Sequence, residues 1–137
     1  MRGVASALLG VENEVNLLDM EASIEHLARG TPGGVDCMLV VVEPYYRAME
    51  TAGRIVPLAK ELGITRLIGI ANKVRDTEDS RAIRDYCRGK DLELAIEIPF
   101  DDAVRSADRR GHALIDDAPD SPTARAVADL AAQLYGG

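Results

Sequence analysis

The sequence predicts an α/β fold of three layers, in which helices cover both faces of a mainly parallel β-sheet. Short segments rich in branched residues alternate along the chain with longer segments of helical period. In addition, residues 38–42 and 67–71 are apolar at successive positions, which is typical of strands covered on both faces. The 137 residues contain no internal repeat and no linker, so we expect a single domain over residues 1–137.

The strands are expected over residues 14–19, 35–43, 65–72 and 92–99. The last of them alternates, with Glu93 and Glu97 on one side and four apolar residues on the other: Leu92, Leu94, Ile96 and Ile98. Such alternation predicts a position near the edge of the sheet, where one face is partly wet.

Helices are expected over residues 45–63, 76–89 and 121–135, after a turn-rich connector over residues 116–122. Pro57 lies inside the first and has no N–H to donate, so it predicts a kink or two abutting helices. Ser121 is the expected N-cap of the last helix, with Pro122 as its first residue.

The charge balance is acidic, with 16 Lys and Arg against 23 Asp and Glu. A net charge of -7 disfavours binding to nucleic acid or to an anionic membrane. Cys37 and Cys87 show no metal-binding or disulfide-framework spacing, which favours a reducing, cytoplasmic location. The N-terminus does not read as a signal peptide, and the longest apolar run is far too short for a membrane span.

Ligands of an open parallel sheet bind beyond the carboxyl ends of its strands. The residues predicted at those ends are therefore the candidates for a site: Asp19, Glu43, Pro44, Asn72, Lys73, Pro99, Phe100 and Asp101. Each also has a plainer interpretation, since Asp19 is compatible with a helix N-cap, Glu43 with a strand end, and Asn72 with a loop.

The segment DMEASIEHLARGT, residues 19–31, resembles the switch segment of the MinD/ParA-like P-loop ATPases, and it is similar to the carbon monoxide dehydrogenase accessory (CooC) type. The resemblance continues in order through five further segments: VDCMLVVVEP (35–44), TAGRIVPLAKELGI (51–64), IANKV (70–74), IPFDDAV (98–104) and ADRRG (107–111).

The resemblance implies roles for the candidate residues. Asp19 matches the catalytic aspartate that lies near the attacking water and holds Mg through a water molecule. Asn72 matches the amide that reads the base, and Pro99, Phe100 and Asp101 match a stretch that closes over it. Glu43, Pro44 and Lys73 complete the expected nucleotide-binding set. In the family the cofactors are ATP and Mg, members dimerise around ATP, and the CooC type is linked to nickel insertion into an enzyme.

Two departures from the family pattern matter. The P-loop pattern G-x-x-x-x-G-K-[ST] is absent, and Gly30–Gly34 is glycine-rich without the lysine. Ser23 stands where the switch usually has glycine. We therefore expect an incomplete P-loop NTPase fold, which is Rossmann-like and corresponds to the C-terminal part of such an ATPase. We also expect this chain alone to bind ATP weakly or not at all and not to hydrolyse it.

The missing P-loop strand lies, in the resembled fold, between the strand that ends at Asp19 and the strand that ends at Glu43. We expect these two strands to pair directly, or a second chain to supply the missing one.

Three functions follow from these expectations. The first is a remnant or split part of a MinD/CooC-like ATPase that acts with a protein partner or as a homodimer. The second is a non-catalytic α/β protein-interaction module. The third, ranked last, is a receiver-like phosphoacceptor domain, because Asp19 and Glu21 are not an adjacent acidic pair and no third-strand aspartate is present.

Overall fold

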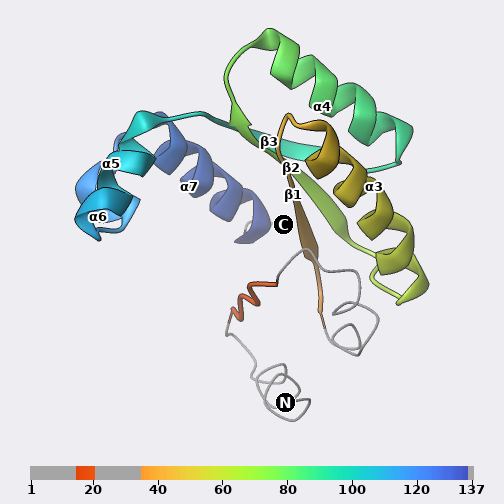
Figure 1. Cartoon of the computed structure of the whole chain (residues 1–137). Coiled ribbons are helices and arrows are strands. Elements are labelled where there is room, and N and C mark those ends of the chain that lie inside the picture. The colour runs from red at the N-terminus through yellow and green to blue at the C-terminus, as the bar shows by residue number, and fades with distance from the viewer. Residues whose placement is uncertain (1–14, 21–34, 136–137) are drawn as a thin grey trace.

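The computed structural model of the chain describes residues 15–20 and 35–135. Its sheet has parallel strands in the order β1-β2-β3, so β2 is central (Figure 1). The strands are β1 (Met38–Val42), β2 (Leu67–Val74) and β3 (Leu94–Pro99). The predicted α/β class with a parallel sheet is confirmed.

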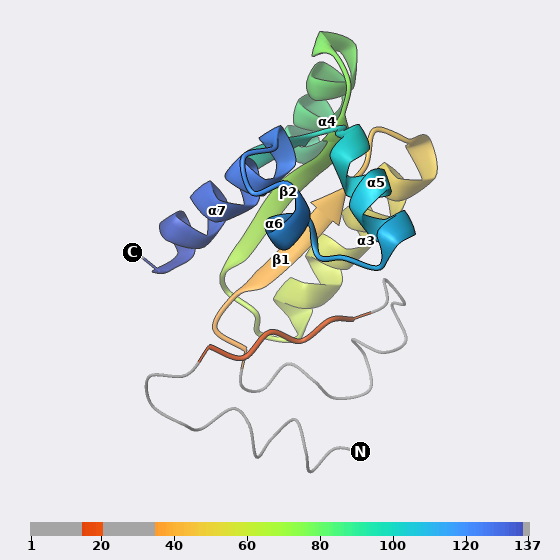
Figure 2. The same cartoon turned by 90° about the vertical axis from the view of Figure 1, so that its left-hand side faces the viewer.

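Helices cover both faces of the sheet, as the three-layer prediction requires. Those described are α3 (Tyr46–Glu61), α4 (Thr77–Gly89), α5 (Asp102–Arg110), α6 (Leu114–Asp117) and α7 (Pro122–Tyr135). Figures 1 and 2 show α3 and α4 on one face and α7 on the other, while α5 and α6 lie beyond the carboxyl end of β3. No described helix has both the length and the apolar character to cross a lipid bilayer.

The strand predicted over residues 14–19 is not formed by residues 15–19, so that prediction is wrong for the described part of the segment. Residues 15–20 have no regular secondary structure, and residue 14 lies outside the described chain. Val15 and Leu17 are exposed in this segment. An apolar run gains a strand conformation only where a neighbouring strand accepts its backbone hydrogen bonds, and no described strand does so here.

The direct pairing predicted between this segment and residues 35–43 is therefore also wrong. Within the described residues β1 pairs only with β2, and its other edge is open. Supply of a strand by a second chain stays a prediction.

The core divides into two clusters, one on each face of the sheet. On the α3 and α4 face, Val40 and Val42 of β1 pack with Ala52, Ile55 and Ile83. On the α7 face, Ile70 and Ile98 pack with Leu130.

The expected burial of β1 on both faces is only partly correct. Val41 is 56% exposed. The reason is the position of α7, which packs chiefly on β3 and leaves the far side of the sheet less covered.

Strand β3 is an edge strand, as predicted, but its apolar residues do not share one face. The pairing with β2 shifts between Gly69 opposite Leu94 and Ile70 opposite Ile96, an irregularity of the β-bulge kind. Leu94 consequently packs with the α3 and α4 cluster, whereas Ile96 packs with the α7 cluster.

The helix boundaries have local causes. Ser121 accepts from the Ala124 N–H at 3.2 Å and Pro122 opens α7, which confirms the predicted cap. Pro57 lies inside one uninterrupted helix, so the version with two abutting helices is wrong. Helices α5 and α6 were not predicted, because α5 buries only Ala107 and shows no apolar stripe.

Candidate functional site

The carboxyl ends of the parallel strands bring two of the predicted residues into direct contact. The Lys73 Nζ lies 2.6 Å from the Glu43 Oε1, across the ends of β2 and β1. Strand β2 runs to Val74, beyond the end predicted at Asn72, so both Asn72 and Lys73 belong to the strand. We refer to this end of the sheet as the carboxyl edge.

Lys73 adopts a left-handed backbone conformation, with φ of 58°. It sits where the pairing of β2 with β3 is irregular, between Ala71 and Val74. For a residue with a side chain this conformation costs about 1–2 kcal/mol. The ion pair with Glu43 is partly exposed and is worth at most about 1 kcal/mol. The surrounding strand pairing, more than the ion pair, must therefore hold Lys73 in place, as is common at functional sites.

Phe100 forms the next part of the carboxyl edge. Its N–H donates to the Val74 carbonyl at 2.9 Å, which fixes the turn after β3 against the end of β2. The Arg75 guanidinium lies 4.4 Å from the centre of the Phe100 ring. The ring is 41% exposed, so this pair offers a flat surface at the edge. Sequence reasoning missed Arg75, although a basic residue just past a strand end was a usable signal.

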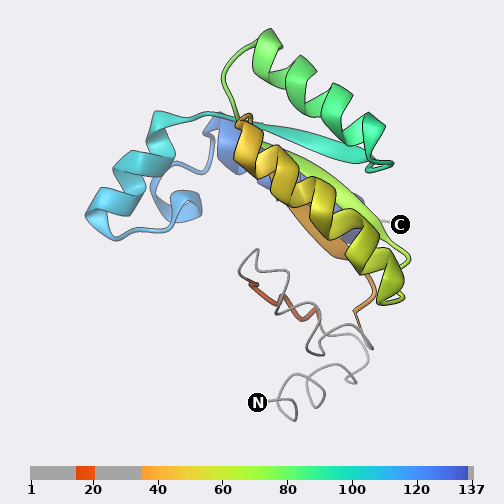
Figure 3. The same ribbon diagram turned by 45° about the vertical axis from the view of Figure 1, so that its right-hand side comes forward.

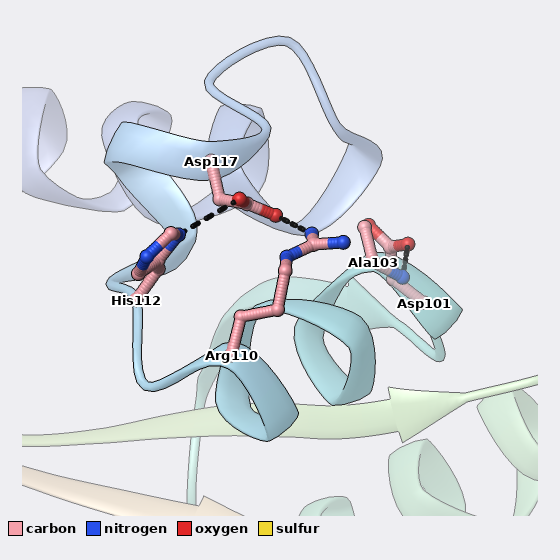
Figure 4. Close-up of polar contacts among 5 residues, drawn as sticks. All are labelled: Asp101, Ala103, Arg110, His112 and Asp117. Carbon is pink, nitrogen blue, oxygen red and sulfur yellow. Dashed lines mark hydrogen bonds and ion pairs between the residues drawn. The ribbon is translucent and has the colours of Figure 1, made fainter.

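Asp101 binds together the starts of two helices. Its Oδ1 accepts from the Ala103 N–H at 2.8 Å and caps α5, while its Oδ2 accepts from the Thr123 N–H at 3.2 Å in α7 (Figure 4 shows the Ala103 bond). The Thr123 hydroxyl donates to the Pro99 carbonyl at 3.1 Å. These contacts, and above all the Ala103 N–H, hold the pKa of Asp101 below its usual range. We call this group of residues (Pro99, Asp101, Ala103 and Thr123) the Asp101 clasp.

The remaining predicted site residues, Asn72, Pro44 and Asp19, make no side-chain hydrogen bond or ion pair with Glu43, Lys73, Phe100 or Asp101 in the described part of the chain. Asn72 is half-buried in β2, and Pro44 is half-buried in the bend between β1 and α3. Asp19 is exposed and makes no hydrogen bond or ion pair with any other described residue. Its segment, residues 15–20, lies toward the amino ends of the strands (Figures 1 and 3). The structure does not bring Asp19 to the carboxyl edge.

A second polar cluster joins α5 to α6. The Asp117 carboxylate accepts a hydrogen bond from Arg110 and contacts the His112 Nδ1 at 3.2 Å (Figure 4). Arg110 is the main cause of the lowered pKa of Asp117, and His112 adds to it. This cluster closes the connection between two helices.

Comparison with known proteins identifies relatives along most of the chain. The carbon monoxide dehydrogenase accessory protein CooC of Rhodospirillum rubrum is 40% identical over 119 residues, which cover 87% of this chain and 44% of that protein. An uncharacterized ATP-binding protein of Methanocaldococcus jannaschii is 41% identical over 105 residues, which cover 76% of this chain and 40% of that protein. No family profile matches the chain.

Solved structures share the fold. The cell-division protein MinD of Aquifex aeolicus superposes with a TM-score of 0.65 at 22% identity, over 76% of this chain and 45% of MinD. The same protein in its complex with MinC gives a TM-score of 0.64. The chain belongs to the MinD/ParA-like P-loop ATPase family. It spans less than half the length of these relatives.

The family's Mg and phosphates do not fit the described residues. No group of three or more His, Cys, Asp or Glu side chains in the described ranges is placed to hold a metal ion. Glu43 is paired with Lys73, and both oxygens of Asp101 accept backbone N–H groups. Cation binding at either carboxylate would compete with these contacts. Among the residues that the structure describes, the carboxyl edge thus offers no ready-made donor set for Mg.

The edge suits the base side of a nucleotide better. Phe100 and Arg75 offer an exposed planar surface, and flat π-systems and guanidinium groups stack on aromatic rings. Asn72, at the same end of β2, has an amide that both donates and accepts. Which of these residues contacts a nucleotide stays a prediction.

Proposed function

We propose that this chain is the base-recognition part of a MinD/CooC-like ATPase and acts together with a phosphate-binding part that these 137 residues do not contain. The observation that carries the proposal is 40% identity to CooC over 119 residues, in a chain whose sequence contains no P-loop pattern. Asn72, Pro99 and Phe100 are the residues assigned to the base. Asp19 is assigned to the catalytic role only in the combined protein.

The proposal includes the absence of hydrolysis by this chain alone. Most of the affinity for ATP and of the charge stabilisation in phosphoryl transfer comes from backbone amides and a lysine around the β- and γ-phosphates. Titration of the isolated chain with Mg-ATP in a calorimeter is expected to give no binding in the micromolar range. Binding of Mg-ATP in the micromolar range would contradict the proposal that this chain alone lacks the main phosphate contacts.

The recognition role is tested in a chimera, in which this chain replaces the matched region of the R. rubrum CooC protein. We expect the chimera to bind ATP, and Asn72→Ala and Phe100→Ala to weaken the affinity about tenfold each, because each removes a contact to the base. Gln133→Ala, an exposed change on α7, is the matched control and is expected to have no effect. Unchanged affinity in both site variants would overturn the assignment.

A protein-interaction module without a nucleotide role is the second candidate. It is favoured by the open edge of β1, an element that pairs readily with another polypeptide. If the chimera folds but fails to bind ATP, the protein-interaction module is favoured over the nucleotide-binding function. A role in nickel insertion rests on the CooC resemblance, and we assign no nickel contact to the described residues of this chain.

A further inference from the structure

Pro99 ends β3 and opens the turn that contains Phe100, and it offers a single backbone group for hydrogen bonding. Proline has no N–H, so the carbonyl oxygen of Pro99 is the one backbone atom through which a hydrogen bond can hold this residue. The Thr123 hydroxyl donates to that oxygen at 3.1 Å. A side chain 24 positions further along the chain thus holds the end of β3.

The turn after Pro99 is held from two sides. On the side of the sheet, the Phe100 N–H donates to the Val74 carbonyl at 2.9 Å. On the side of α7, the Thr123 N–H donates to the Asp101 carboxylate at 3.2 Å, and the hydroxyl of the same residue binds Pro99. Thr123 therefore contacts both ends of the turn. Between these fixed points the Phe100 ring remains partly exposed and accessible to a ligand.

A role confined to starting α7 does not account for the Thr123 hydroxyl. The N-cap of α7 is Ser121, which accepts from the Ala124 N–H at 3.2 Å. The N–H of Thr123 is already satisfied by Asp101. Neither contact uses the hydroxyl, so its bond to the Pro99 carbonyl serves the turn and not the helix.

We propose that Thr123 is a positioning residue for the nucleotide base, because its hydroxyl fixes the carbonyl of Pro99 and thereby the ring of Phe100 at the carboxyl edge. This role rests on the proposed function, which assigns Pro99 and Phe100 to the base. Thr123 acts through these two residues and is assigned no contact of its own with the nucleotide. A turn that is already ordered loses less conformational entropy when the base binds, which strengthens binding.

Three variants isolate the hydroxyl. Thr123→Val removes it and keeps the branched shape of the side chain. The bond from the backbone N–H to Asp101 is retained in this variant. Thr123→Ser keeps a hydroxyl donor and is the conservative rescue. Thr51→Val is the matched control, because the Thr51 hydroxyl also donates to a backbone carbonyl, that of Arg47 at 2.9 Å, but lies within α3.

Amide hydrogen exchange of the whole natural chain, without ligand, measures how firmly the turn is held. The Phe100 amide is the reporter, because it is hydrogen-bonded to the Val74 carbonyl. We expect its exchange to be about three- to tenfold faster in Thr123→Val, the effect of one lost hydrogen bond, and unchanged in Thr123→Ser and Thr51→Val. An equal exchange rate in Thr123→Val and the natural chain would overturn the proposal.

Binding to the chimera with the R. rubrum CooC protein separates positioning of the base from a general loss of stability. Inorganic tripolyphosphate carries no base and serves as the comparison ligand for ATP. We expect Thr123→Val to weaken ATP binding about three- to tenfold and to leave tripolyphosphate binding unchanged. Thr123→Ser and Thr51→Val are expected to bind both ligands like the unsubstituted chimera. An equal loss for both ligands, or no loss for ATP, would overturn the positioning role.

Failure of this role can be told apart from failure of the proposed function. A folded, unsubstituted chimera that does not bind ATP contradicts the proposed function, and the nucleotide role of Thr123 falls with it. A chimera that binds ATP equally well with and without Thr123→Val leaves the proposed function in place and removes only the role of Thr123.

Discussion

At the scale of single residues, Asp101 shows how a residue predicted for ligand binding also organises the chain. Its carboxylate caps α5 and holds the start of α7 through Thr123. The sequence places Asp101 correctly after a strand, but the contact with Thr123 spans 22 positions and has no local signal.

Asp101→Ala is expected to lower the free energy of unfolding by about 1–2 kcal/mol at neutral pH, as for other lost N-caps. The pKa of Asp101 is lowered in the folded chain from the ordinary 3.8. Its contribution is therefore present above about pH 4 and is lost as the pH falls through the folded-state pKa. Urea denaturation at pH 7 and at pH 3 measures both effects. The neighbouring Asp102→Ala is the control, and an equal loss in both variants would argue against the clasp.

Two substitutions of Lys73 separate the cost of its left-handed backbone conformation from the contribution of its ion pair with Glu43. Lys73→Gly and Lys73→Ala both remove the contact with Glu43, but only glycine adopts φ of 58° without a steric penalty. The glycine variant is expected to be more stable than the alanine variant by about 1 kcal/mol. Denaturant unfolding of both variants gives the comparison. Equal stabilities would mean that the left-handed conformation at this position is not strained.

At the scale of elements, α3 keeps a proline that its own sequence predicts to be disruptive. Pro57 lies exposed inside Tyr46–Glu61, while Ile55, Val56 and Ala59 around it are buried. The buried side chains hold the helix together where the hydrogen-bond ladder lacks a donor.

Pro57→Ala is expected to stabilise the chain by about 2 kcal/mol, because a helix interior disfavours proline by about 3 kcal/mol and the unfolded chain regains part of that. Thermal or urea unfolding checks it. Arg54→Ala, an exposed change one turn earlier, is expected to shift the stability by less than about 0.5 kcal/mol. If the free energy of unfolding does not rise in Pro57→Ala, the proline does not destabilise α3.

At the scale of the whole molecule, the open edge of β1 links stability to association. A polypeptide that binds only the folded chain raises the melting temperature as its concentration rises. We expect this rise for the natural sequence when the region of the R. rubrum CooC protein that this chain does not match is added, and a concentration-independent melting temperature for Val41→Lys. Differential scanning calorimetry at several concentrations measures it. A concentration-independent melting temperature in both would count against pairing through β1.

The sequence by itself determined the α/β class, the three described strands to within a few residues and the edge position of β3. These depend on apolar periodicity and turn chemistry, which are local. The tertiary structure alone decided which face Leu94 and Ile96 occupy, because a bulge in the pairing with β2 separates them. It also decided that residues 15–20 form no strand and that Val41 stays exposed. Strand pairing and burial depend on which neighbours are present, and a local pattern carries no information about a neighbour.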